Sequence, residues 1–504
     1  MPQFDHLNSQ EFPFLYALAL FDAPLSQAAM LDLLLLRREQ FSVGGVVPGI
    51  SLVREQMAAL YEKKMLTQVS GRGYALADGL QLPMLAHLLQ YADVGSWVQS
   101  LRFMLNQRGD YSLWKTQNAA FCRRELFFSC LTDDDDGIVH WRQKFFDAYT
   151  GETLPLAANL FQAPAGEQIF ASFNPFCQGL LLNDLFFDAN WSALDCRAAY
   201  HYTRGQMAHN NVIFELAFEQ FVWQALLRGD FATLVQAGDF CPPPSMHRYA
   251  FVHAFVHEKY DVALQTGVLI AKQIKQESGR RKVHFENLLG LLHTACLLTS
   301  DAPEHRKQLK EHVDHAIKNN TAFSYFLLES LSNHLAKGVP QESKRYALHR
   351  ALSVDTLFEA LALLWEGEEP RPDAHQRFKD AIALYAQRGY TWLAAELDAV
   401  LVTHYGDAPR MPSWHAEQQR TPLHRILQRE ESWQRALSAL AQLPLGKNET
   451  RSNEQAEQRL IWLLGLMHNQ AHIEPREQKR NAKGVWSKGR PVALKRLSSE
   501  PQDF

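Results

Sequence analysis

The chain has 504 residues, of which 46% are hydrophobic and 21% charged, with a formal net charge of -4 at pH 7. These values exclude a disordered or fibrous protein, and the length exceeds what one hydrophobic core usually serves, so we expect several domains. Six cysteines without a C-x-x-C pair exclude a dense disulfide scaffold and predict buried thiols in a reducing compartment.

The first residues lack the basic and apolar regions of a signal peptide. The longest apolar run, residues 28–36, contains Asp32 and is much shorter than a membrane span. We therefore expect a cytoplasmic protein with no membrane partner. Its fold class is predicted to be mainly α.

Residues 1–82 are predicted to form a winged-helix-like module. Two helical stretches, 12–21 and 25–40, are followed by a third helix that Ser51 can cap, with Leu52, Met57, Leu60 and Tyr61 on one face. Residues 66–69 and 74–76 are strand-like, and the glycine-rich turn between them suits a tight hairpin. Three helices followed by a hairpin is the order of a winged helix.

The third helix of this module can read DNA or dock a protein, and both alternatives stay open. Its candidate nucleic-acid-binding residues are Arg54, Lys63 and Lys64. The same surface carries Glu55 and Glu62, so its charge is mixed.

Residues 83–210 form a predicted helical middle region, with helices around 84–106, 112–130 and 139–149. The acidic run 133–136 lacks the alternating ligands and closing glutamate of an EF-hand loop. We therefore interpret it as a solvated loop between helices.

Residues 211–468 are predicted to form an irregular α-solenoid of tetratricopeptide-like helical hairpins. Residues 214–227 and 378–387 are each followed by an Arg-Gly turn, an aromatic residue and a second amphipathic stretch. Similar units are expected at 250–275 and 323–337. Stacked hairpins leave a long face for a protein or peptide partner.

The chain contains no catalytic motif that we recognise: Gly446-Lys447 lacks the rest of a phosphate-binding loop, and no nucleophile elbow or zinc-protease motif occurs. His247, His253 and His257 near Cys241 are candidate metal ligands, but their apolar helix favours packed histidines. The acidic stretch around Glu366 is interpreted as a solvated loop. No cofactor, metal site or catalytic residue is predicted.

Residues 469–504 form a predicted basic junction or tail. Residues 471–497 hold eight Lys/Arg and two Glu, a net charge of +6, which leaves -10 for the rest of the chain. Such a segment can neutralise phosphates while a tryptophan stacks on bases, although an ordinary basic linker fits the charge as well. Its candidate nucleic-acid-binding residues are Arg476, Lys479, Arg480, Lys483, Trp486, Lys488, Arg490, Lys495 and Arg496.

Two motifs in this tail, E-P-x-E-Q-K-R at 474–480 and G-x-W-S-K-G-R-x-V-A-L-K-R-L at 484–497, carry a family resemblance. They resemble the junction before the ATPase core of large bacterial Swi/Snf-type helicase-like proteins, whose N-terminal region is helical. The chain lacks the family's Walker A lysine, D-E-x-H-type box and arginine finger, so no catalytic residue carries over. The resemblance implies that ATP-dependent translocation on duplex DNA would reside in a longer parent protein.

Two functions follow as expectations. The first is a non-catalytic regulatory or scaffolding region of a Swi/Snf-like DNA translocase, which binds a protein partner and approaches DNA through its tail. The alternative is a free-standing adaptor or transcriptional regulator, in which the winged helix contacts DNA. A helical enzyme with an unfamiliar site is a minor third possibility.

Overall fold

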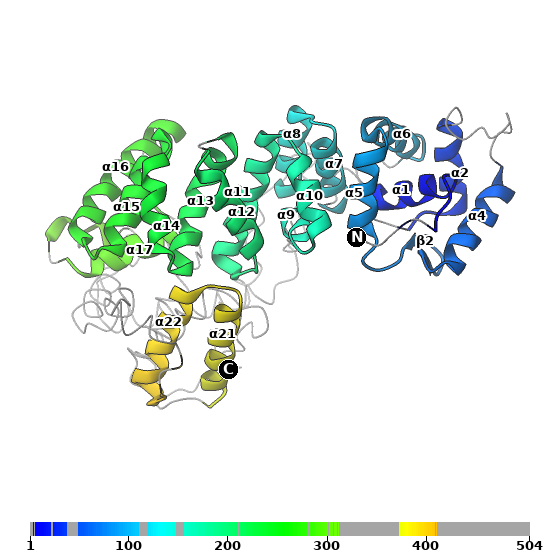
Figure 1. The fold of residues 1–504 in the computed structure, drawn as a ribbon. Helices are drawn as coiled ribbons and strands as arrows, with labels where there is room; N and C mark the ends of the chain where they lie inside the picture. Colours follow the sequence, from blue (N-terminus) through cyan, green and yellow to red (C-terminus); the bar gives the residue numbers. More distant parts are fainter. Residues whose placement is uncertain are drawn as a thin grey trace, which may run out of the picture. The chain divides into compact units, whose positions relative to one another are not determined.

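The structure is a computed structural model that describes residues 4, 6–21, 24–37, 49–109, 119–147, 156–209, 211–279, 282–285, 287–300, 302–305, 307–309, 311, 372–408 and 410. This part of the chain is mainly helical, as predicted, with one two-stranded sheet (Figure 1). It divides into two compact units. The first comprises Met1–Ala189 and Cys196–Phe221, and the second comprises Asn190–Asp195 and Val222–Phe504.

The first unit begins with three helices and a β-hairpin, drawn in blue in Figure 1. These elements are α1 (Phe12–Phe21), α2 (Gln27–Leu36), α4 (Ile50–Glu62), β1 (Leu66–Val69) and β2 (Gly73–Leu76). The strands are antiparallel, with Leu66 paired to Leu76. The first helix and the first strand have the predicted bounds.

A third extended segment joins the hairpin at Leu25, between α1 and α2. Leu25 and Tyr74 exchange backbone hydrogen bonds of 2.8 and 2.9 Å in an antiparallel bridge. Gly73 has a positive φ of 119°, and a Cβ there would collide with the Leu25 backbone. The glycine of the turn is therefore needed for this close approach.

Helix α4 differs from its prediction at both its start and its buried face. It begins at Ile50 after Gly49, so Ser51 lies inside the helix and is not its N-cap. The buried residues are Val53, Met57 and Leu60, whereas Leu52 and Tyr61 are 40% and 50% exposed. A helical period of 3.6 places Leu52 one position off the stripe that Val53 shares with Met57 and Leu60.

The rest of the first unit is a succession of helices. They are α5 (Gln81–Tyr91), α6 (Val94–Gln107), α7 (Ala119–Leu131), α8 (Asp135–Asp147), α9 (Leu156–Leu160), α10 (Pro164–Ser172), α11 (Pro175–Ser192), α12 (Arg197–Met207) and α13 (Val212–Arg228). The last residues of α11 and α13 belong to the second unit. The helix predicted over 84–106 is two helices, because Asp93 caps α6 through the Ser96 N–H at 3.2 Å.

The acidic run 133–136 is predicted to be a loop between helices, but part of it is helical. Asp135 and Asp136 form the first turn of α8, and Asp134 accepts a 2.9 Å hydrogen bond from the Gly137 N–H. Carboxylates at a helix N-terminus satisfy unpaired N–H groups and interact favourably with the helix dipole. The clustering of acidic residues therefore has a local structural cause.

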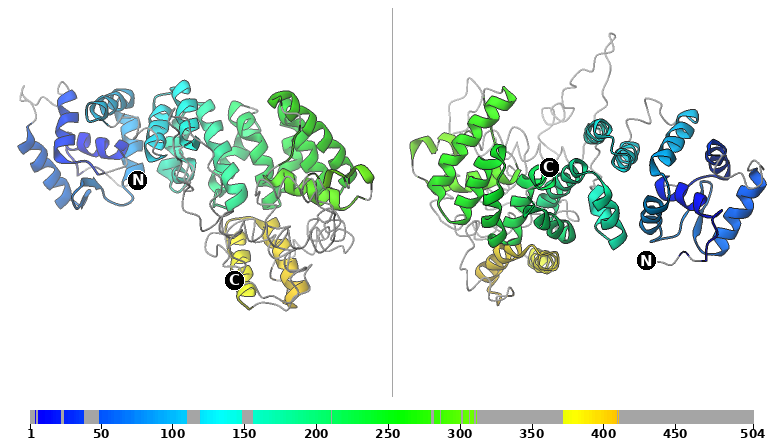
Figure 2. Two further views of the ribbon diagram at one scale, coloured as in Figure 1. Left: turned by 180° about the vertical axis from the view of Figure 1, so that it is seen from behind. Right: turned by 45° about the horizontal axis from the view of Figure 1, so that its top comes forward.

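The second unit contains α14 (Phe231–Ala237), α15 (Met246–Val256), α16 (Tyr260–Ser278), α17 (Asn287–Leu298), α21 (Pro372–Gln387) and α22 (Thr391–Val400). Short 3-10 turns, Gly238–Phe240 and Pro243–Ser245, lie between α14 and α15, and a π-helical turn, Leu401–Tyr405, follows α22. Helices α15 and α16 pack side by side, as do α21 and α22 (Figure 2). None of the described helices combines the length and apolar character that crossing a bilayer requires.

The two Arg-Gly turns that the sequence singled out contact each other within this unit. The Arg228 guanidinium donates to the Arg388 carbonyl at 3.0 Å and lies 4.4 Å from the centre of the Tyr390 ring. The Tyr390 hydroxyl donates to the Leu194 carbonyl at 2.6 Å, and the Thr391 hydroxyl donates to the Arg228 carbonyl. Side chains of each turn thus donate hydrogen bonds to the backbone of the other, although the turns are 160 residues apart in the sequence.

Candidate binding site

Most of the predicted nucleic-acid-binding residues lie outside the described residues. This applies to the whole basic tail, namely Arg476, Lys479, Arg480, Lys483, Trp486, Lys488, Arg490, Lys495 and Arg496. The hairpin predicted over 323–337 and the acidic stretch around Glu366 also lie outside them.

The three predicted cations of the first module have different environments. Arg54 is exposed on α4 and Lys64 is exposed just after it. The Lys63 ammonium instead lies 2.7 Å from a carboxylate oxygen of Glu11, which is 1% exposed. The charge of Lys63 therefore neutralises a buried carboxylate of the same chain.

The ion pair with Lys63 favours the ionised form of Glu11. Burial by itself raises the pKa of the Glu11 carboxyl, but the Lys63 ammonium and the Asn8 N–H donate to it and favour its ionised form. The balance leaves the pKa of Glu11 below its ordinary value. Lys63 thus has a structural role in the chain, in addition to being a candidate for DNA contact.

The candidate metal ligands near α15 are brought together only in part. The rings of His253 and His257 lie 4.4 Å apart, and the pKa of His253 is lowered by burial and by the neighbouring charges of His257 and Lys259. Burial raises the pKa of Cys241 to about 11, which disfavours the thiolate that binds metals. Within the described ranges, no three His, Cys, Asp or Glu side chains are placed to share an ion.

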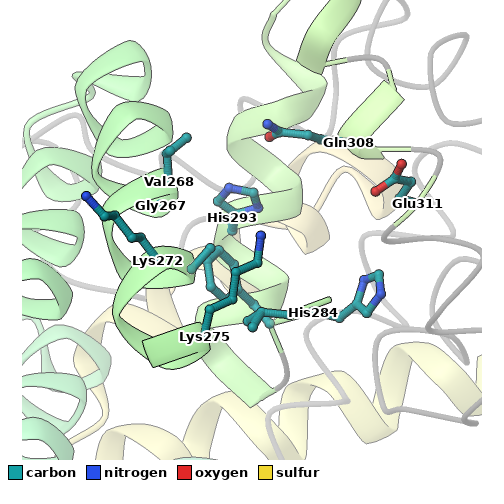
Figure 3. Close-up of a pocket in the computed structure, with 11 residues that line it drawn as sticks. Gly267, Val268, Lys272, Lys275, His284, His293, Gln308 and Glu311 are labelled. Atoms are coloured by element: carbon teal, nitrogen blue, oxygen red, sulfur yellow. The ribbon is translucent and has the colours of Figure 1, made fainter. Parts of the chain in front are cut away.

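A pocket of about 320 Å³ opens in the second unit beside α16 (Figure 3). Its walls come from α16 between Gly267 and Lys275, the segment 283–285, α17, and the side chains of Gln308 and Glu311. The lining residues are Gly267, Val268, Ala271, Lys272, Lys275, Val283, His284, Phe285, His293, Gln308 and Glu311.

One wall of the pocket is built by a glycine that faces a histidine. His293 on α17 is 3% exposed, and its ring meets Phe285 edge-on at 4.8 Å. A Cβ on Gly267 would lie 2.7 Å from the His293 ring, closer than side chains tolerate. Glycine at position 267 therefore allows α16 to approach the imidazole that lines the pocket.

The rim of the pocket carries two lysines from successive turns of α16. Lys272 and Lys275 are exposed, and neither forms an ion pair with any residue that the structure describes. In Figure 3, Lys275 extends towards His293, whereas Lys272 extends to the other side of the rim. Glu311 lies on the wall away from α16, so the cations gather on the α16 side.

An apolar stripe leads away from the pocket along the same helix. Val268, which lines the pocket, is 55% exposed, and Val262 and Leu269 are also exposed. Val268 precedes Lys272 by four residues and Lys275 by seven, Leu269 precedes Lys272 by three, and Val262 precedes Leu269 by seven. Because such spacings place side chains on neighbouring parts of a helix surface, these residues lie on the same broad face of α16 as the lysines. We call Val262, Val268 and Leu269 the α16 stripe.

The chemistry of the lining favours binding over covalent catalysis. Among the described lining residues there is no hydroxyl or thiol that could act as a nucleophile. The groups present are cations, imidazoles, one amide, one carboxylate and apolar side chains, which suit an anionic ligand with an apolar portion.

Sequence reasoning missed this pocket. The expected unit at 250–275 covers α15 and most of α16, but it contains no motif that marks Lys272 or Lys275. The available signal was their spacing of three beside exposed apolar residues. Comparison of the chain with known protein families, characterised proteins and solved structures finds no match.

Proposed function

We propose that this chain is a non-catalytic regulatory or scaffolding region that serves a bacterial Swi/Snf-like DNA translocase. It holds a protein partner on the helical hairpins of the second unit and approaches DNA through its basic tail. The observation that carries the binding function is the exposed α16 stripe beside the lysine rim of the pocket. Apolar side chains that are exposed next to one another on a soluble surface are typical of interaction sites.

The choice of binding over catalysis rests on the site and on the motifs. The pocket is open and has no hydroxyl or thiol among its described lining residues, and the sequence contains no phosphate-binding loop. Helical hairpins that pack in succession supply surface for a partner, as α15 with α16 and α21 with α22 do here.

Partner binding at the α16 stripe is testable by site-specific photo-crosslinking in cells. A photoreactive amino acid at Leu269 is expected to give one discrete adduct with a protein partner. The matched control is Val139 on α8, which is similarly exposed and apolar but lies in the first unit. Equal, diffuse labelling from both positions would contradict a partner at the stripe.

The translocase part of the proposal rests on the motifs at 474–480 and 484–497. Its test is to read the gene onward from codon 504. A Walker A motif in the same reading frame supports the proposal. An in-frame stop with no helicase-like gene adjacent contradicts it and favours a free-standing protein.

A free-standing DNA-binding regulator is the second candidate, and the Leu25–Tyr74 bridge favours it. A backbone bridge from Leu25, between the first two helices, to the hairpin supports a winged-helix arrangement. The exposed surface of α4 is mixed, however, because it presents Leu52 and Tyr61 as well as Arg54 and Glu55. That mixture also suits docking to a protein.

A further inference from the structure

The charge around the α16 pocket is opposite in sign to that of the chain as a whole. Without residues 471–497 the chain has a formal charge of -10, yet the described residues that line the pocket include two lysines, Lys272 and Lys275, and one acid, Glu311. Two buried or half-buried imidazoles, His284 and His293, add hydrogen-bonding nitrogens to the lining. A local cationic spot on an acidic body attracts an anionic group and disfavours a basic one.

The apolar stripe indicates which kind of molecule carries this anionic group. A small inorganic anion would occupy the pocket and leave Val262, Val268 and Leu269 exposed to water. A peptide with a carboxylate side chain and neighbouring apolar residues would satisfy both surfaces, because both lie along one helix. The volume of about 320 Å³ is that of a pocket for one or two side chains and not for a folded domain.

We infer that the α16–α17 pocket binds an acidic peptide segment of a protein partner. A carboxylate of the peptide lies between the Lys275 ammonium group and the His293 wall, with Lys272 as a second cation on the rim, and an apolar residue of the same peptide covers the α16 stripe. Glu311, on the opposite wall, keeps a second carboxylate away from that side. This inference rests on the proposed scaffolding function and assigns the chemical class of its ligand.

The test uses the full chain and a short fluorescent peptide that contains both glutamate and leucine. Binding is followed by fluorescence anisotropy and compared with a peptide in which every glutamate is glutamine. The inference predicts measurable binding of the acidic peptide and weakening by about tenfold or more for the glutamine peptide.

The variant that tests the site is Lys272→Gln together with Lys275→Gln. Both side chains are exposed, so the fold is expected to survive, which circular dichroism checks. The double variant is expected to bind the acidic peptide about tenfold more weakly. Lys282→Gln is the matched control, because Lys282 is an exposed lysine close by in the sequence that does not line the pocket. It is expected to change the affinity by less than about twofold.

Each contrary outcome is informative. No binding of the acidic peptide by the native chain, or equal weakening by Lys282→Gln, overturns the inference. Displacement of the peptide by inorganic phosphate at similar concentrations also overturns it, in favour of a small-anion site. Displacement by duplex DNA, lost in the double variant, would make the ligand a nucleic acid. In each of these cases an adduct at Leu269 still supports the proposed scaffolding function, so the two failures are distinguishable.

Discussion

Single charged residues in this protein have roles that their sequence context conceals. Lys63 directly follows the helix that the sequence predicts to be a recognition helix, where a lysine is typical of phosphate contact. In the structure its ammonium pairs with Glu11, which is buried at the start of α1. Because a buried carboxylate without a cation is energetically costly, the main role of Lys63 is to pair with Glu11.

Lys63→Gln is expected to destabilise the contact between α1 and the end of α4 by about 1–3 kcal/mol, because it leaves a buried acceptor poorly satisfied. Hydrogen exchange of the backbone amides of these two helices measures the effect. Lys64→Gln is the control, since Lys64 is adjacent and exposed, and little change is expected. Equal effects of the two substitutions would contradict the structural role of Lys63.

The same ion pair predicts a pH dependence. The pKa of Glu11 is lower in the folded state than in the unfolded state, so its stabilising contribution is full above the unfolded value. That contribution is lost as the pH falls through the lower, folded pKa. Protection of the α1 amides is therefore expected to weaken below about pH 4 in the native chain. In Glu11→Gln this loss should be smaller.

Gly267 is expected to be intolerant of even one added methyl group. Gly267→Ala would push the His293 ring out of place and destabilise the packing of α16 on α17 by about 1–3 kcal/mol. Gly205→Ala on α12 is the control, because open space surrounds Gly205 and alanine favours the helix by about 0.4–1 kcal/mol. Thermal unfolding should therefore shift in opposite directions for the two variants.

At the scale of elements, two turns of similar sequence contact each other. The turns after α13 and α21 both carry Arg-Gly, with positive φ at Gly229 and Gly389. Their arginines and Tyr390 satisfy backbone carbonyls at helix ends, where intrahelical partners are missing. The repeated motif therefore joins α13 to the α21–α22 hairpin.

Tyr390→Phe is expected to loosen this junction by about 1–2 kcal/mol, because it removes the donor to the Leu194 carbonyl at a buried ring. Hydrogen exchange of the α22 amides measures the change. Tyr249→Phe is the comparison, because its hydroxyl lies 3.4 Å from the Val235 carbonyl in a more exposed place. Its effect should be under about 0.5 kcal/mol.

At the scale of the whole molecule, the proposed contact with DNA depends on the uneven charge of the sequence. An acidic body is expected to repel duplex DNA, whereas the net charge of +6 on residues 471–497 is expected to attract it. If this tail makes the contacts, the logarithm of the affinity should fall with the logarithm of salt concentration with a slope of about -5 to -7.

Duplex binding between about 50 and 200 mM salt measures this slope. Replacing the eight basic residues of the tail by glutamine should abolish the salt-dependent binding. Arg54→Gln in the first module should leave it nearly unchanged. The reverse pattern would favour the free-standing regulator that reads DNA with α4.

The sequence alone determined the mainly helical class, the bounds of α1 and β1, and the order of helices and hairpin in the first eighty residues. These features follow from hydrophobic periodicity and from turn residues, which act within a few positions along the chain. Local patterns also located the two Arg-Gly turns. They failed for residues 133–136, where a polar run can be either a loop or the start of a helix.

Only the tertiary structure decided which side chains meet. The pairing of Lys63 with Glu11, the contact between turns 160 residues apart, and the place of His293 against Gly267 all depend on packing between distant segments. At the wall of the pocket beside α16, the His293 ring of α17 lies against Gly267, where a side chain would collide with it. The sequence pattern of a single helix cannot predict this contact, because it depends on how two helices pack against each other.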